Sequence, residues 1–290
     1  MPNYVIITDS TTDLPADLIK ELDILVLPLS FTIDGNTYED YSDGRDLPLK
    51  DFYNKVRAGK MSVTSQINPE DFIKAFEPIL KNGNDILYIA FSSGLSGTYQ
   101  SANIAADKLK ELYPERKIAI VDSLCASMGE GLFVYYAVMK KREGMNINEL
   151  EKWLNDNKLK FCHWFTVDDL HHLRRGGRVS AATAILGSML SIKPVLHVDD
   201  EGHLILMGKS RGRRKSLDCL VSKFEEIAID PKNQIVFISH GDCEDDANYV
   251  ANEIKKKFNV KNVIISMIGP VIGSHSGPGT IALFFVGNKR

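Results

Sequence analysis

The first half of the chain alternates short, β-rich apolar runs with longer segments that have helical periodicity. Strands and helices that follow one another in this way are typical of a parallel sheet covered by helices. The run Ile86–Phe91 is apolar on both of its alternating faces, as a strand buried between two helix layers must be. We predict the strands Tyr4–Thr8, Ile24–Phe31, Ile86–Phe91 and Lys117–Val121, and the helices Leu47–Ala58, Pro69–Lys81, Ser96–Leu112 and Gly129–Arg142.

The pattern changes after about Glu143, where the expected elements no longer alternate regularly. A hairpin is expected over Pro194–Leu206, because its turn contains Gly202. At 290 residues, the chain has about twice the length of a typical domain. We therefore predict an α/β fold of two domains: a Rossmann-like parallel sheet with helices on both faces at residues 1–157, and a smaller mixed α/β domain at residues 158–290.

Composition and charge exclude several classes of protein. No apolar run approaches the roughly eighteen residues of a membrane span, so no stable membrane insertion is expected. The net charge of −3 and the absence of aromatic residues in the basic segment Lys209–Lys215 predict no nucleic-acid partner. The short apolar stretch near the N-terminus lacks the basic region of a signal peptide, which predicts a cytoplasmic protein. The cysteines lie too far apart for a paired thiol site: Cys125, Cys162, Cys219 and Cys243.

Hydroxyl-bearing segments follow several of the expected parallel strands. The carboxyl ends of such strands meet at one edge of a sheet, where α/β proteins bind ligands. In Ser92–Thr98, two glycines allow a ligand to approach the backbone, and the following helix directs free amides toward it. The segment lacks the lysine of a Walker A loop and the glycine spacing of a dinucleotide site. It predicts an anion site, although an ordinary helix cap would use the same residue types.

A second polar segment, Thr64-Ser65-Gln66, precedes the expected helix that starts at Pro69. Asn68 before Pro69 is a standard helix start, which explains these two residues but not the three polar ones upstream. If this segment faces Ser92–Thr98, the hydroxyls of both segments form a neutral cradle for a carboxylate. The residues that we predict to bind the ligand from these two segments are Thr64, Ser65, Ser96 and Gly97.

A serine hydrolase or esterase is the alternative interpretation. The segment Gly94–Thr98 nearly matches a nucleophile elbow, with Ser96 as nucleophile, His275 as base and Asp242 as the third member in the expected chain order. The match fails at Thr98, because the tight turn of an elbow requires a small residue rather than a β-branched one. Hydrolysis therefore stays as the second candidate function.

Two further glycine-containing segments lie in the second half of the chain. Leu170–Ser180 holds three arginines around two glycines, a composition that suits phosphate. Its histidines, His171 and His172, project about 100° apart on a helix and are not expected to share a metal ion. Ile268–Gly279 is predicted to be a loop that contains His275. This histidine could donate a hydrogen bond to a carboxylate or phosphate, or only brace its turn.

Taken together and in this order, these motifs resemble the DegV family of bacterial fatty-acid-binding proteins across nearly the whole chain. The combination of motifs is highly specific. The matching segments are Thr8-Asp9-Ser10-Thr11, Thr64-Ser65-Gln66, Ser92–Ala102, Arg175-Gly176-Gly177-Arg178 with Ile192-Lys193-Pro194, and His275-Ser276-Gly277-Pro278-Gly279.

The resemblance implies a long-chain fatty acid in a buried tunnel between the two domains, with its carboxylate held by Thr64 and Ser96. Members that act as the fatty-acid-binding subunit of fatty acid kinase present the carboxylate to a separate ATP-binding subunit, which makes an acyl phosphate for phospholipid synthesis. Arg174 and His275 match the residues that assist transfer there. On this interpretation the chain is a lipid-binding carrier with no intrinsic catalytic residue, no metal, and no cofactor other than bound fatty acid.

Overall fold

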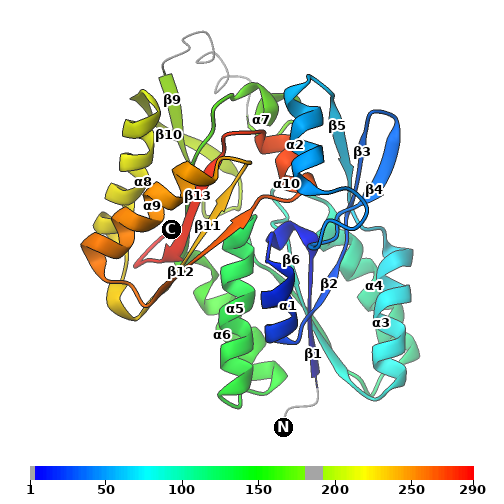
Figure 1. The fold of residues 1–290 in the computed structure, drawn as a ribbon. Coiled ribbons are helices and arrows are strands. Elements are labelled where there is room, and N and C mark those ends of the chain that lie inside the picture. The colour runs from blue at the N-terminus through cyan, green and yellow to red at the C-terminus, as the bar shows by residue number, and fades with distance from the viewer. Residues whose placement is uncertain (1–3, 180–191) are drawn as a thin grey trace.

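Figure 1 shows the computed structural model, which describes residues 4–179 and 192–290. These residues form a four-stranded, a three-stranded and a six-stranded sheet, which we call sheets A, B and C. The strands of sheets A and B come from residues 4–122, and those of sheet C come from residues 161–286. The predicted α/β class is confirmed, with a parallel sheet followed by a mixed one. The domain division after residue 157 stays a prediction.

Sheet A is parallel throughout, in the order β2-β1-β6-β7. Its strands are apolar on both faces, so both faces must be covered. Helices α1, α5 and α6 pack on one face, and α3 and α4 pack on the other. The strands are β1 (Tyr4–Asp9), β2 (Leu25–Leu27), β6 (Asp85–Ala90) and β7 (Ile118–Asp122). The helices are α1 (Ala16–Leu22), α3 (Pro69–Lys81), α4 (Thr98–Leu112), α5 (Met128–Arg142) and α6 (Ile147–Asn157).

Sheet C has the order β10-β9-β8-β13-β11-β12, and only its β11 and β12 pair in parallel. Helices α8 and α9 cover one face, and α5 packs on the other. Helix α5 therefore lies between sheets A and C (Figure 1). The strands are β8 (Phe161–Thr166), β9 (Ile192–Val198), β10 (Leu204–Arg211), β11 (Ile235–His240), β12 (Asn262–Met267) and β13 (Ile281–Val286). The helices are α8 (Arg213–Ile227) and α9 (Glu244–Phe258).

Sheet B is antiparallel, in the order β4-β3-β5, and the sequence analysis did not predict it. Asp34 and Gly35, with φ of 55° and 79°, form the two-residue turn between β3 and β4. Helix α2 packs against the sheet through Phe52 and Tyr53. The elements are β3 (Ser30–Ile33), β4 (Asn36–Glu39), β5 (Ser62–Ser65) and α2 (Leu49–Arg57).

Two predicted elements require correction. Ile24–Phe31 is not one strand, because Pro28 has no N–H for a sheet and separates β2 from β3, which join different sheets. The predicted loop Ile268–Gly279 contains the helix α10 (Pro270–Ser276), whose first position is a proline. A short helix, α7 (His171–Arg175), follows β8. Ser180, at the end of the arginine-containing segment, lies outside the described residues.

Short 3-10 turns connect some of these elements, at Ser10–Thr12, Lys158–Lys160 and Pro231–Asn233. Among the described residues, no helix combines the length and the apolar character that crossing a membrane requires.

Candidate ligand-binding site

A cavity of about 190 Å³ lies between the carboxyl edge of sheet A and one face of sheet C. A single water needs only roughly 10–15 Å³, so the space holds far more than an isolated water. It lies where the parallel strands of sheet A end, as the sequence analysis expected. Both sheets and their loops supply its apolar wall, which includes Leu29, Phe91, Phe165, Val198, Ala282 and Phe284.

One end of this cavity, which we call the polar end, carries Thr64 and His275. Thr64 lies on β5 and His275 on α10, and Thr64 Oγ1 is 2.9 Å from His275 Nε2. The two residues are 211 positions apart in the chain, so only the tertiary structure brings them together. The other residues predicted to bind the ligand, Ser65, Ser96 and Gly97, line the same cavity. All five residues that the sequence predicts to bind the ligand therefore line one cavity.

His275 is neutral in this environment. Its burial and the nearby Arg178 guanidinium lower the pKa of the His275 imidazole to about 4. Nδ1 of this ring has no hydrogen-bond partner among the described residues and lies against Gly176, where a Cβ atom would be 2.1 Å away. In the tautomer that carries its proton on Nε2, the ring donates to Thr64 and leaves the Thr64 hydroxyl proton free for a bound carboxylate.

Two buried carboxyl groups hold the N-terminus of α10. The Gly269 N–H donates to Asp13 over 2.8 Å, and the Val271 N–H donates to Asp40 over 3.3 Å. These bonds satisfy amides that a helix start leaves without intrahelical partners. Burial raises the pKa of both carboxyl groups, and that of Asp40 reaches about 7. The position of His275 therefore depends on residues from the N-terminal part of the chain.

The two hydroxyl-bearing segments predicted from the sequence lie in contact. The Ser96 hydroxyl is 2.9 Å from Thr98 Oγ1 and accepts the Thr98 N–H over 3.2 Å, at the start of α4. Gln66 donates from Nε2 to Ser101 of the same helix over 3.0 Å. A Cβ atom at Gly97 would lie 2.3 Å from Gln66 Oε1, so the glycine permits this contact. The segments form one polar wall.

The arginine of the polar end is Arg178, which the sequence motifs contain but to which they gave no role at the ligand site. It lines the cavity, and its Nε donates to the Leu95 carbonyl over 3.2 Å. Burial lowers the pKa of its guanidinium. Arg174 is exposed on α7 and is not among the residues that line this cavity or the depression described next. Gly177, with φ of 70°, redirects the chain after α7 and so separates the surroundings of the two arginines.

An outer depression of about 260 Å³ adjoins the polar end. Thr64, Arg178 and His275 line both spaces. The outer depression also carries Lys60 and Arg175, which are exposed cations. A group held between Thr64 and His275 would therefore have an apolar cavity on one side and a basic depression on the other.

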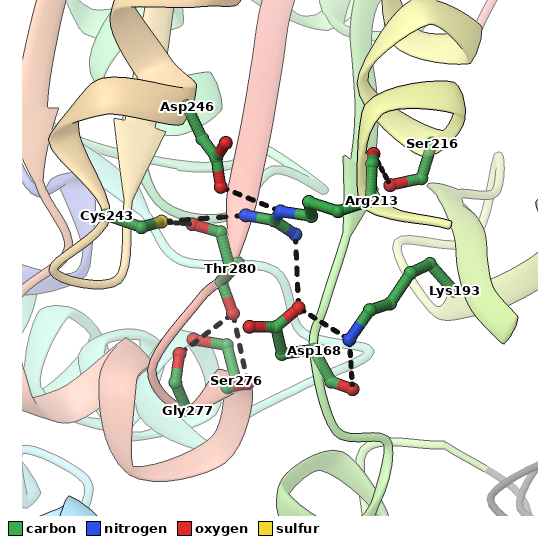
Figure 2. A network of polar contacts seen from close by, with 9 residues as sticks. All are labelled: Asp168, Lys193, Arg213, Ser216, Cys243, Asp246, Ser276, Gly277 and Thr280. Carbon is green, nitrogen blue, oxygen red and sulfur yellow. Dashed lines mark hydrogen bonds and ion pairs between the residues drawn. The ribbon is translucent and has the colours of Figure 1, made fainter. Parts of the chain in front are cut away.

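A network of ion pairs braces the elements around the polar end (Figure 2). Arg213, at the start of α8, donates to Asp246 over 2.7 Å and lies 3.5 Å from Asp168. Lys193 pairs with the same Asp168 over 2.7 Å. The Asp168 carboxylate packs against Gly279, where a Cβ atom would be 2.2 Å away. Because Asp168 precedes α7 and Gly279 follows α10, the network fixes the two helices that flank the polar end.

Some predicted features have other roles in the structure. Within the basic segment Lys209–Lys215, Arg213 belongs to the ion-pair network and Arg214 stacks on Tyr249, 3.5 Å from the ring centre. His171 is exposed on α7. Across residues 4–179 and 192–290, no group of three or more His, Cys, Asp or Glu side chains is arranged to hold a metal ion.

The structure gives no support to the serine hydrolase interpretation. The Ser96 hydroxyl is bonded within its own loop and His275 is bonded to Thr64, with no Ser96–His275 hydrogen bond among the described residues. Asp242 pairs with Arg57 instead of the histidine. A catalytic base must reach both its nucleophile and its orienting acid, so these residues do not form a triad.

A mostly apolar cavity with a polar end has the character of a site for an amphipathic small molecule. A family model described as "Uncharacterised protein, DegV family" matches residues 3–288. A DegV domain-containing protein of Clostridium perfringens is 49% identical over 290 residues, which covers 100% of this chain and 99% of the relative. The chain belongs to the DegV family, as its motifs predicted.

Solved structures support the same assignment. The fold is similar to that of a DegV lipid-binding protein from Thermotoga maritima, with a TM-score of 0.88 and 30% identity over 100% of both chains. It is equally similar to a fatty-acid-binding DegV family protein from Thermus thermophilus, with a TM-score of 0.88 and 32% identity over 98% of this chain and 99% of that one. Both relatives are lipid-binding or fatty-acid-binding proteins.

Proposed function

We propose that this chain binds a long-chain fatty acid in the cavity between sheets A and C. The observation that carries the proposal is an apolar cavity whose one polar end is formed by Thr64 and His275. A fatty acid has the matching chemistry, with a long apolar tail and one carboxylate. The fatty-acid-binding relative from Thermus thermophilus supports the same ligand class.

In this proposal the tail supplies most of the affinity. Burial of an acyl chain contributes roughly 0.8 kcal/mol per CH₂, on the order of 10 kcal/mol for a long chain before the cost of association. The polar end then has only to orient the carboxylate. Hydroxyl groups and a neutral imidazole do this without a tight buried ion pair. The groups that hold the carboxylate are Thr64, Ser65, Ser96, Gly97 and His275.

The proposal extends to a separate ATP-dependent kinase subunit, to which the chain presents the carboxylate. One carboxylate oxygen attacks the γ-phosphorus of ATP, the bond from this phosphorus to its bridging oxygen breaks, and ADP leaves. The product is an acyl phosphate for phospholipid synthesis. The outer depression supports this step, because Arg175 and Arg178 line it beside the polar end, and cations stabilise the negative charge that develops on a phosphoryl group in transfer. Lys60 lines it too and is paired with Asp34 over 2.7 Å. The chain itself acts as a carrier without a nucleotide site.

The transfer-assisting residues in this proposal are His275 and an arginine. The resemblance points to Arg174, whereas the position of Arg178 at the boundary of both spaces favours Arg178. The variants Arg174→Ala and Arg178→Ala distinguish between these two assignments.

The ligand position is tied to the predicted domains. We place the fatty acid between residues 1–157 and residues 158–290, in a cytoplasmic protein. The lining supports this placement, because Phe91 comes from the first part and Phe165 and Phe284 come from the second.

A coupled assay tests the complete proposal. The purified chain, loaded with fatty acid, is mixed with the ATP-binding subunit of a fatty acid kinase and ATP, and acyl phosphate is trapped with hydroxylamine as the hydroxamate. We expect product only when both proteins are present. Acyl phosphate formation at the same rate without this chain would contradict the carrier role, and retention of fatty acid with no product would contradict presentation to the kinase.

A further inference from the structure

The end of the cavity opposite Thr64 contains a buried histidine, His163, that the proposed function does not use. His163 lies on β8, is 1% exposed and lines the cavity together with Phe284 of β13. An imidazole is unusual in an otherwise apolar wall, so its role requires an explanation.

The register of β8 and β13 places His163 at the far end of the cavity. Thr280 lies beside the polar end, because its hydroxyl donates to the Ser276 carbonyl at the end of α10. From Thr280, β13 leads to Ala282, which pairs with Phe165, and then to Phe284, which pairs with His163. At about 3.4 Å per residue, the level of Phe284 is roughly 14 Å from that of Thr280. This depth suits an extended acyl chain rather than a short organic acid.

Both ring nitrogens of His163 are used within the protein. Nδ1 is 2.9 Å from the Phe161 carbonyl, which can only accept, so Nδ1 carries the proton. Nε2 is then an acceptor, and it takes the Ala126 N–H over 3.3 Å. Burial lowers the pKa of His163 well below its usual value, so the ring stays neutral. The ring therefore has no free polar atom for a ligand and presents carbon to the cavity.

Helix α5 lies directly behind this ring. A Cβ atom at Gly129 would be 2.0 Å from His163 Nε2 and 2.7 Å from Phe284 Cδ1. The absence of a side chain at Gly129 is what lets both rings fit against the helix backbone. The cavity cannot extend past His163 in this direction, because a helix backbone gives way far less easily than a side chain.

The hairpin of β9 and β10 closes the same end from another side. Val198 and Leu204 of this hairpin line the cavity. The turn between them is tied to the first part of the chain, since Ser92 Oγ donates to the Gly202 carbonyl over 2.9 Å. Arg290 donates to the Asp199 carbonyl of the same turn over 3.1 Å. The deep end is thus closed by a ring, a helix and an anchored turn.

We propose that His163, backed by Gly129 and flanked by Leu204, forms the floor of the cavity and limits the length of the acyl chain. This inference rests on the proposed fatty-acid binding and deepens it. The polar end orients the carboxylate of every acid in the same way, so the distance to the floor decides which chain lengths fit. An acid with further methylene groups meets the imidazole, whereas a shorter acid leaves apolar wall unfilled.

The test compares the affinity for saturated fatty acids of increasing length in two opposite variants. His163→Ala removes the ring, and we expect the preferred acid to become longer by about two carbons, because each further buried methylene improves affinity by about fourfold. Leu204→Phe adds volume at the floor from a half-buried position, and we expect the preferred acid to become shorter. The control for His163→Ala is His203→Ala, which changes an exposed histidine of the β9–β10 hairpin. The control for Leu204→Phe is Leu206→Phe on β10.

The outcomes separate this inference from the proposed function. If the native protein binds no fatty acid of any length, both fail. If the native protein binds fatty acid but the length preference is unchanged in His163→Ala and in Leu204→Phe, the floor is elsewhere and only this inference fails. If His163→Ala does not fold, Leu204→Phe decides alone: a shorter preferred acid supports the floor, and an unchanged preference overturns it.

Discussion

The two ends of the cavity each contain a neutral histidine, yet they are built for different purposes. At the polar end, His275 is half-buried, and its Nδ1 has no hydrogen-bond partner among the described residues. At the deep end, His163 is fully buried and both of its nitrogens are used by the backbone. Burial lowers the pKa of both rings, so charge does not distinguish them. The partners of the rings do: His275 Nε2 bonds a hydroxyl that also lines the cavity, whereas both nitrogens of His163 are bonded to backbone groups.

The largest expected effect is on transfer at the polar end. His275→Ala and Arg178→Ala should lower the rate of acyl phosphate formation by about 10- to 1,000-fold, because they remove groups beside the charge that develops on the phosphoryl group. Fatty-acid affinity should stay close to that of the native protein, since the tail dominates binding. The coupled hydroxamate assay and a fatty-acid titration measure the two quantities on the same variants.

Arg174→Ala is the matched control, because Arg174 is exposed and lines neither space. If turnover falls more in Arg174→Ala than in Arg178→Ala, Arg174 rather than Arg178 assists transfer. A turnover loss no larger than the binding loss in His275→Ala would show that His275 only holds the ligand.

A smaller effect should follow from moving His275 without removing it. In Gly176→Ala, the new Cβ atom would lie only 2.1 Å from the present position of His275 Nδ1. The backbone conformation of Gly176 is one that alanine adopts without strain. The ring must leave its present position, which disturbs its hydrogen bond with Thr64. We expect turnover to fall by about tenfold, which corresponds to the loss of one hydrogen bond. Gly208→Ala is the control, since a Cβ atom at Gly208 meets nothing within 4 Å. Equal turnover in the two alanine variants would show that the contact between Gly176 and His275 is unimportant.

A still smaller effect is expected on binding when the hydroxyls are removed. Thr64→Ala and Ser96→Ala should each weaken fatty-acid affinity by about 2- to 12-fold, the equivalent of roughly 0.5–1.5 kcal/mol per neutral hydrogen bond. Thr32→Ala, a threonine on the neighbouring strand β3 that does not line the cavity, serves as the control. Unchanged affinity in the double variant would argue that the carboxylate lies elsewhere.

The smallest effect concerns the pH dependence of stability through the anchor of α10. Because burial raises the pKa of Asp40 from 3.8 to about 7, the folded protein holds a proton there that the unfolded chain releases between these values. This group therefore makes the free energy of unfolding decrease as pH rises from about 4 to about 7. Asp40→Asn cannot titrate, so its stability should decrease less with pH over that window.

Denaturant unfolding of Asp40→Asn and the native protein at several pH values measures this difference. The His275 ring, with its pKa near 4, contributes a slope of the opposite sign, so the comparison has to be made between the two proteins rather than within one. The exposed Asp156→Asn on α6 is the control. Parallel stability curves for native protein and Asp40→Asn would contradict the assigned pKa shift.

Much of the fold was predictable because its signals are local. Pro69–Lys81 was predicted with the bounds of α3, since Asn68 caps it and a proline starts it. Sheet B was missed, although Asp34-Gly35 between two short runs is a common signal for a hairpin. The predicted strand Ile24–Phe31 is longer than β2, because the apolar residues continue past Pro28 whereas the hydrogen bonding to β1 does not.

The site was predictable in part. The hydroxyl-bearing segments with Thr64 and Ser96 are visible as motifs, and the structure brings both to one cavity. The choice between Arg174 and Arg178 was not available from spacing, because it depends on the backbone direction after Gly177. The position of His163 on the cavity wall could not be predicted either, because a histidine within a strand pattern does not indicate which face of the strand borders a cavity.

The most direct test of fatty-acid binding is mass spectrometry of lipid extracted from the purified chain. We expect about one fatty acid per chain in the native protein. We expect a large reduction in Ala282→Phe, whose added ring fills the middle of the cavity while the fold stays intact by circular dichroism. Native protein that carries no fatty acid and takes up none when it is supplied would contradict the account.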